Sequence, residues 1–131
     1  MKVMTVTCFE DLEIWKEARE MCQIIRQYTF REPFNHDYRF RDQMNAAAGS
    51  IMDNIAEGFD REGRKEFLQF LSISKGSCGE TRSQSYRAFD SNYINQEELN
   101  DLLNRTHRLK IKIGNFMNYL KNSPLTGTKY K

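Results

Sequence analysis

This chain of 131 residues has few prolines, no motif of paired cysteines and no long apolar run. Its two prolines, Pro33 and Pro124, leave long stretches free for helices, because proline breaks a helix interior. The three cysteines form no Cys-x-x-Cys pair, which argues against a zinc or redox motif and indicates free thiols in a reducing compartment. No stretch approaches about 18 apolar residues and no signal peptide is recognisable, so we expect a cytoplasmic protein with no membrane partner.

Signatures of catalysis and of cofactor binding are missing as well. The two histidines, His36 and His107, are not preceded three positions earlier by glutamate, so the Glu-x-x-His motif of metal-binding bundles is absent. Cys78 has no histidine near it in sequence, and the pair Gly76 and Gly79 lacks the flanking residues of a phosphate loop. We therefore predict no enzyme activity, no metal, no cofactor and no small-molecule substrate. A metal-dependent enzyme is kept only as a third hypothesis.

Helical periodicity fills most of the chain, and no strand pattern of period two competes with it. Apolar positions three and four apart predict four helices, over about residues 9–31, 37–59, 64–90 and 96–121. The short connections between them make consecutive helices antiparallel neighbours. The predicted fold is one domain over residues 1–131, an all-α, antiparallel, up-down-up-down four-helix bundle, with residues 123–131 as a frayed tail.

Two of the predicted helices have well-defined apolar faces. In the fourth helix, spacings of three and four residues alternate without a break, and this is the clearest periodicity in the chain. The positions are Leu99, Leu102, Thr106, Leu109, Ile113, Phe116 and Leu120. The first helix is predicted to bury Leu12, Trp15, Ala18, Cys22, Ile25 and Tyr28. Capping boxes are predicted at the starts of both, from Thr7 with Glu10 and from Asn95 with Glu98, and Gly63 is predicted to cap the third helix.

A polar stripe on the second helix needs partners if it faces the core. Asn54 and Gly58 continue the four-three spacing of the apolar seam, so both are predicted to point inward. An unpaired buried polar group costs about 1–3 kcal/mol. The third helix, which follows a tight turn bracketed by Gly58 and Gly63, is the expected source of partners. We predict a structural polar layer made of Ser50, Asn54, Glu57, Ser77 and Glu80.

Charge is unevenly distributed, although the net charge is only +2. Residues 1–62 carry 8 Lys/Arg against 12 Asp/Glu, whereas residues 63–131 carry 12 against 6. Such asymmetry marks either helices that attract one another or a basic binding face. Under the second alternative, the face that follows a phosphate backbone consists of Arg105, Arg108 and Lys112 on the fourth helix with Arg82 and Arg87 on the third.

Two motifs carry a family resemblance. The start DLEIWKEA places Asp11, Leu12, Trp15 and Ala18 in an Asp-Leu-x-x-Trp-x-x-Ala pattern, and the stretch SIMDNIAEGFDREGRKEF contains Asn-Ile-Ala-Glu-Gly and a trailing Glu-Phe. Over about residues 9–121 the chain resembles the S23-like four-helix bundle family encoded in intervening sequences of bacterial 23S rRNA genes. The resemblance implies a cytoplasmic bacterial homopentamer with no known enzymatic activity. It also implies kinship with the accessory protein of diversity-generating retroelements, which binds a reverse transcriptase and nucleic acid.

Two departures from the family pattern stand on the second helix. Asn45 and Ala46 occupy positions where two arginines are frequent, and Met52 follows the Ser-Ile pair where proline is common. Our first hypothesis is a non-enzymatic, homo-oligomeric scaffold or accessory protein. Its alternative is an accessory factor whose partner is RNA, DNA or a nucleic-acid enzyme. The first hypothesis expects a subunit interface at apolar positions beyond the seam, namely Ala48, Ile55 and Phe59.

Overall fold

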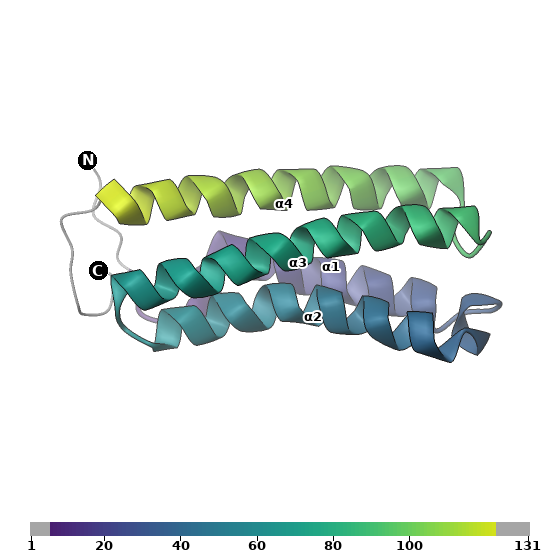
Figure 1. Ribbon diagram of the computed structural model, residues 1–131, viewed down its shortest axis with the longest axis horizontal. Coiled ribbons are helices and arrows are strands. Elements are labelled where there is room, and N and C mark those ends of the chain that lie inside the picture. Colours follow the sequence, from purple (N-terminus) through teal and green to yellow (C-terminus); the bar gives the residue numbers. More distant parts are fainter. Residues whose placement is uncertain (1–5, 123–131) are drawn as a thin grey trace.

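Four long helices make up the computed structural model, which describes residues 6–122 (Figure 1). Their bounds are Glu13–Thr29 for α1, Tyr38–Asp60 for α2, Arg64–Asp90 for α3 and Gln96–Asn122 for α4. Two short 3-10 helices precede α1 and α2, η1 at Phe9–Asp11 and η2 at Phe34–His36. No strand occurs among the described residues, which confirms the predicted all-α class. The predicted frayed tail lies outside the described residues.

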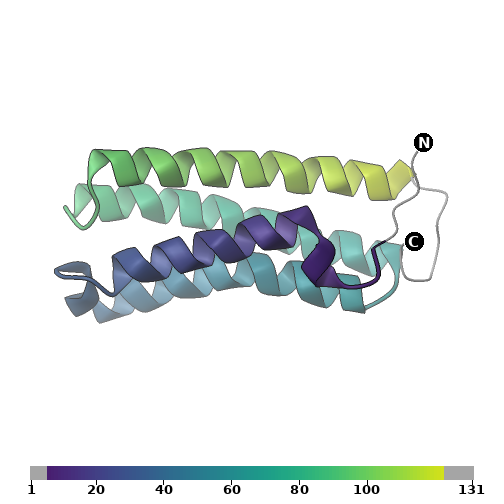
Figure 2. The same cartoon turned by 180° about the vertical axis from the view of Figure 1, so that it is seen from behind.

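The four helices lie side by side and run alternately up and down (Figures 1 and 2). α2 packs against both α1 and α3, and α3 packs against α4. α1 and α4 also touch, which closes the bundle, although their contact is less extensive. This arrangement confirms the predicted antiparallel, up-down-up-down four-helix bundle.

The core runs along the axis between the helices. α4 supplies the predicted seam, with Phe116 partly buried and the other six positions fully buried: Leu99, Leu102, Thr106, Leu109, Ile113 and Leu120. On α2, Ala48, Ile55 and Phe59 are at most 1% exposed, so the expectation that they form a subunit interface is wrong. A helix of a four-helix bundle buries a stripe wider than a two-position seam, and these residues fill that width. Within residues 6–122, none of the helices combines the length and the apolar character needed to cross a bilayer.

α1 begins later than predicted, and its buried stripe coincides with the predicted face only in part. Of that predicted face, Leu12, Ala18 and Ile25 are buried. The predicted capping box at Thr7 is wrong, because the chain first forms η1, and Leu12 then precedes α1 without a side-chain cap. Trp15, Cys22 and Tyr28, from the predicted face, are only partly buried. Neighbouring stripes of this helix are both apolar, and only its packing against the rest of the bundle selects between them. The stripe that is buried consists of Ile14, Ala18, Met21, Ile25 and Thr29.

The turn between α2 and α3 brings these helices into close contact. Gly58 is buried, and a Cβ atom there would lie 2.7 Å from Cβ of Phe70 and 2.9 Å from Cδ1 of Phe67. Any larger residue would push the helices apart, so this position requires glycine. Gly63 is the N-cap of α3, as predicted, whereas the left-handed backbone conformation falls on Glu62, with φ of 67°.

At the opposite end of the bundle, reciprocal hydrogen bonds fix the start of α4. The backbone N–H of Glu98 donates to Oδ1 of Asn95, and the N–H of Asn95 donates to Oε1 of Glu98, both at 2.8 Å. The predicted capping box is therefore confirmed. Arg31, just beyond α1, donates to both carboxylate oxygens of Glu98, at 2.6 and 2.5 Å. These Arg31 hydrogen bonds lower the pKa of Glu98 and join the end of α1 to the start of α4.

Candidate nucleic-acid interface

Three of the five residues predicted for the polar layer meet between α2 and α3. Asn54 Nδ2 donates to the backbone oxygen of Ser50 at 2.7 Å and to its Oγ at 2.9 Å. Ser77 Oγ, on α3, donates to Ser50 Oγ at 2.9 Å. One turn away, Ser74 Oγ donates to the backbone oxygen of Ile51 at 2.8 Å. Small polar side chains therefore join the two helices without an ionisable group.

Glu57 and Glu80 stand outside this layer, contrary to the prediction. Both are exposed. Glu57 pairs with Arg61 on its own helix at 2.8 Å, and Glu80 accepts a hydrogen bond from Gln84 at 3.5 Å. A carboxylate needs a cation or water around it, and the serine-lined contact between α2 and α3 offers no cation. The expectation that these two side chains face inward is therefore wrong.

The three predicted basic residues of α4 face α1, where carboxylates bind them. Arg105 pairs with Glu20 of α1 at 2.8 Å and with Asp101, one turn earlier on α4, at 2.9 Å. Arg108 Nε lies 3.2 Å from Oε1 of Glu17, and Lys112 Nζ contacts Oε2 of the same carboxylate. Three cations thus meet three carboxylates, which leaves no net positive charge. We call this set the α1/α4 ion-pair edge: Glu17, Glu20, Asp101, Arg105, Arg108 and Lys112.

The two predicted basic residues of α3 lie apart from that edge. Arg82 reaches α4, where its Nη1 donates to the backbone oxygen of Leu103 at 2.7 Å and to Oγ1 of Thr106 at 3.3 Å. Arg87 places its guanidinium 4.3 Å from the ring centroid of Phe40 on α2. The five residues predicted to form one basic face therefore contact three different helices, and the structure does not bring them together.

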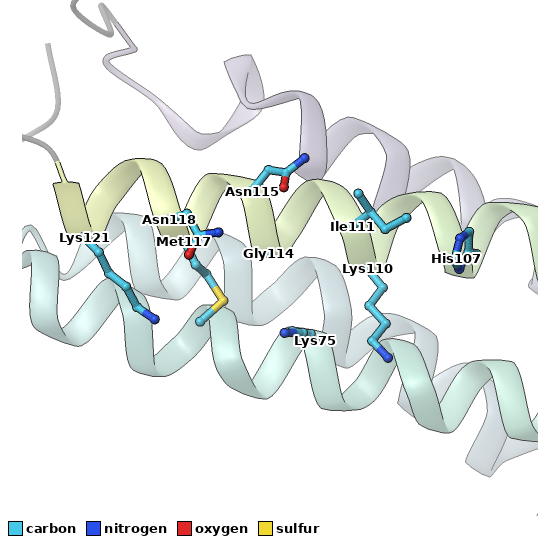
Figure 3. A pocket seen from close by; sticks show the side chains of 9 residues that line it. All are labelled: Lys75, His107, Lys110, Ile111, Gly114, Asn115, Met117, Asn118 and Lys121. Atoms are coloured by element: carbon cyan, nitrogen blue, oxygen red, sulfur yellow. The ribbon is translucent and has the colours of Figure 1, made fainter.

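A different set of cations lines a hollow between α3 and α4, with a volume of about 440 Å³ (Figure 3). Lys110 and Lys121 of α4 extend toward α3, and Lys75 of α3 lies between them along the hollow. None of these three lysines forms an ion pair with another described residue. The other lining residues include no carboxylate: His107, Ile111, Gly114, Asn115, Met117 and Asn118.

A second hollow continues the first along the same two helices. The two share His107 in their linings, so they meet at that side chain. No Asp or Glu lines the second hollow either, and its residues are Arg82, Asn100, Leu103, Asn104 and His107. We call the two hollows together the α3/α4 groove. It is an open cationic surface of a kind that attracts anions.

A signal for this groove was present in the sequence, on the opposite side of α4 from the predicted residues. Lys110, Met117 and Lys121 are seven and four positions apart and therefore share one helix face. The choice between this face and that of Arg105 and Lys112 depends on where the carboxylates of α1 lie. A pattern on one helix does not contain that information.

Neither Cys78, which is buried, nor Cys22, which is partly buried, has an activated thiol. Burial raises the pKa of Cys78 to about 11, and its Sγ donates to the backbone oxygen of Thr106 at 3.1 Å. Burial, with a smaller contribution from Asp53, also raises the pKa of Cys22 to about 11. A thiol with such a pKa stays protonated near neutral pH, and the thiolate is the reactive form. Among residues 6–122, no cluster of three or more His, Cys, Asp or Glu side chains is placed to hold a metal ion.

The fold and the surfaces described above define a four-helix-bundle protein with the α1/α4 ion-pair edge on one side of α4 and the α3/α4 groove on the other. The chain belongs to the 23S rRNA-intervening sequence protein family, whose sequence model matches residues 10–115, and this confirms the resemblance of the motifs. It is also similar to the crystal structure of a protein of unknown function from the S23 ribosomal protein family of Bacteroides thetaiotaomicron. The TM-score is 0.73 and the identity 19%, covering 80% of this chain and 95% of that chain, and at this identity the likeness shows the fold alone. No curated protein matched the sequence.

Proposed function

We propose that the protein is a non-enzymatic, self-associating scaffold or accessory protein of the cytoplasm. The observation that carries the proposal is the outward side of α3. Ile73 and Tyr86 on this helix are 51% and 46% exposed. Between them, a Cβ atom at Gly76 or Gly79 would meet nothing within 4 Å. Small residues with exposed apolar ones on adjoining faces of the helix allow a helix of a second copy to pack closely.

Light scattering at micromolar concentration tests self-association. We expect a mass several times that of the 15.5 kDa chain, and a pentamer is the assembly that the family resemblance favours. Ile73→Glu should shift the protein to a smaller species, because a carboxylate would then be buried in the interface. Gln27→Glu, an exposed position on α1, adds the same charge and should leave the mass unchanged. A monomeric wild-type protein would contradict the proposal.

Nucleic-acid binding is a second candidate function, and the composition of α4 favours it. Residues 102–122 carry five Lys/Arg and no Asp/Glu. The carboxylates of α1 and Asp101 bind three of these cations, Arg105, Arg108 and Lys112. Lys110 and Lys121 keep their charge available toward α3. A surface whose cations have no ion pair with a described residue, and whose described lining has no carboxylate, supports binding to a phosphate backbone.

Fluorescence anisotropy with a labelled, structured RNA tests this second function. Phosphate neutralisation releases counterions, so the affinity should fall steeply when the salt concentration is raised from 50 to 200 mM. Undetectable binding at 50 mM salt would exclude the nucleic-acid function and leave the scaffold proposal standing.

A further inference from the structure

The α3/α4 groove differs from the α1/α4 ion-pair edge, because its described lining residues include cations and no anions. Lys75, Lys110 and Lys121 line one part of it, and Arg82 lines the other. Neither lining contains Asp or Glu. Like charges gathered along one groove repel one another unless a bound anion or salt screens them. The groove is therefore a place where an anionic ligand lowers the free energy of the protein itself.

The length of the groove indicates a polymer. From Asn100, which lines one end, to Lys121 at the other, α4 advances 21 residues, or about 32 Å at 1.5 Å per residue. A single phosphate or nucleotide would contact only a part of this row. In a B-form duplex each strand has one phosphate about every 3.4 Å of axis, and an unstacked strand is more extended, so at most about nine phosphates lie along this row.

The chemistry of the lining indicates which part of a nucleic acid is bound. Among residues 6–122, no Phe, Tyr or Trp lines the groove, so none of these residues offers a base a ring on which to stack. Lysine ammonium groups act as point charges that hold phosphate without reading a sequence. The amides of Asn104, Asn115 and Asn118 add donors for phosphate or sugar oxygens.

We infer that the α3/α4 groove binds the phosphodiester backbone of one nucleic-acid strand, without base readout. This inference rests on the nucleic-acid function proposed above and places its ligand on the groove. RNA and DNA share the chemistry that is recognised, and one groove of cations follows one backbone. Charge contacts come from Lys75, Lys110, Lys121 and Arg82, and the α1/α4 ion-pair edge takes no part.

The test compares two triple variants with equal change in charge. In the groove variant, Lys75, Lys110 and Lys121 are each replaced by Gln. In the control variant, Lys16→Gln, Arg39→Gln and Lys65→Gln remove three exposed cations that do not line the groove. Binding of a labelled 20-nucleotide single-stranded RNA of mixed sequence, and of the DNA of the same sequence, is measured between 50 and 200 mM salt. Circular dichroism confirms that both variants remain folded.

Four contacts predict a slope of log affinity against log salt of about −3 for a single strand, at about −0.7 per contact. The groove variant should lose at least about tenfold in affinity at 50 mM salt, and its slope should become shallower by about 2. The control variant should stay within about threefold of the wild type, because screened charges away from the ligand contribute little. RNA and DNA, and different base compositions, should bind within a few fold of one another.

Three results would overturn the inference. If both variants lose affinity equally, binding is spread over the whole surface, and the nucleic-acid function survives without the groove. If poly-glutamate competes as well as RNA at equal charge concentration, the ligand is an acidic protein segment instead. If a duplex binds much better than either of its strands, the one-strand assignment is wrong. Absence of any binding by the wild type would refute the nucleic-acid function itself.

A length series provides a second measurement that does not depend on variants. Strands of 4, 8, 12 and 16 nucleotides are compared at 50 mM salt, each with an equal molar amount of protein. Affinity should rise until the strand spans the groove of about 32 Å, which takes at most about nine nucleotides, and should then increase only slowly. Equal affinity of 4-mer and 16-mer strands would contradict a groove-long contact.

Discussion

The two long edges of α4 carry similar residues but differ in their electrostatic state. Toward α1, Arg105, Arg108 and Lys112 each contact a carboxylate, and two of those carboxylates belong to α1. Toward α3, Lys110 and Lys121 line an open groove whose lining residues include no acid. Positive charge by itself therefore does not distinguish a binding surface from a structural one. The neighbouring helix decides, by supplying or withholding carboxylates.

The difference also assigns different roles to the two edges. α1 and α4 share the least extensive of the four contacts between neighbouring helices, and ion pairs bridge them there. α3 and α4 pack extensively through apolar side chains, so their contact does not need the lysines above it. Charge near α1 should contribute to stability, and charge in the groove should contribute to binding.

The largest effect on stability is expected from reversing the charge at Glu17 of the α1/α4 ion-pair edge. Its carboxylate is 16% exposed and contacts both Arg108 and Lys112. Glu17→Lys would place three cations together, and we expect the free energy of unfolding to fall by about 2–3 kcal/mol. Urea denaturation measures it. Glu80→Lys, an equal change at an exposed position of α3, should stay within about 0.5 kcal/mol. Equal effects of the two substitutions would mean that the edge is not structural.

The second-largest effect is expected from adding a carboxylate to the α3/α4 groove, which would make the groove resemble the α1/α4 ion-pair edge. Gly114 lines the groove, and a Cβ atom there would meet nothing within 4 Å. Gly114→Glu should lower nucleic-acid affinity about tenfold, or about 1.4 kcal/mol, because the carboxylate would compete for the lysines. It should also raise the free energy of unfolding by up to about 1 kcal/mol, since glycine is a poor helix former.

Gly114→Gln is the matched control for that substitution. It should give a similar gain in stability, while affinity changes by less than about threefold, because glutamine adds no charge. Anisotropy and urea denaturation on the same samples separate the two effects. Equal loss of affinity in both variants would indicate a steric cause and would weaken the electrostatic account of the groove.

A smaller effect, dependent on pH, is expected where Glu98 meets Arg31 between the ends of α1 and α4. The Arg31 hydrogen bonds lower the pKa of Glu98 from its ordinary value of 4.5. The folded state therefore binds this proton more weakly than the unfolded state, so the stabilisation is present above pH 4.5 and is lost as the pH falls through the lower folded pKa. Arg31 is 41% exposed, and we expect about 1 kcal/mol after solvent screening.

The measurement for this pair is urea denaturation of wild type and Glu98→Gln from pH 7 to pH 3. The difference between their free energies of unfolding should be about 1 kcal/mol at pH 7 and should shrink toward zero in acid. If the gap between the free energies of unfolding of wild type and Glu98→Gln is constant with pH, the charge of Glu98 does not contribute to it.

The smallest effect compares two lysines that are two positions apart on α4. Lys110→Gln should change the free energy of unfolding by less than about 0.5 kcal/mol, because this lysine has no ion pair with a described residue. Lys112→Gln should lower it by about 0.5–1 kcal/mol, because it breaks the contact with Glu17. Thermal or urea unfolding at 50 mM salt measures the stabilities of the two variants. A larger loss from Lys110→Gln would show that the groove lysines have a structural role.

Local patterns predicted most of the fold correctly. The seam of α4 and the capping box of Asn95 with Glu98 rest on residues three or four apart, whose relation is fixed by helix geometry. The face of α1 was predicted less well, because Trp15 and Met21 belong to neighbouring stripes that are both apolar. Glu57 was assigned to the core by its spacing alone, although an exposed partner, Arg61, stood one turn away.

By itself, the sequence determined the number of helices, their approximate ends and their antiparallel order, since each depends on periodicity and short connections. Only the tertiary structure decided which cations of α4 are neutralised. Glu17 and Lys112 meet across 95 positions of the chain, and Lys75 joins Lys110 only because α3 and α4 lie side by side. Electrostatic interaction depends on distance in space and on the dielectric between the groups, and neither quantity can be read along one helix.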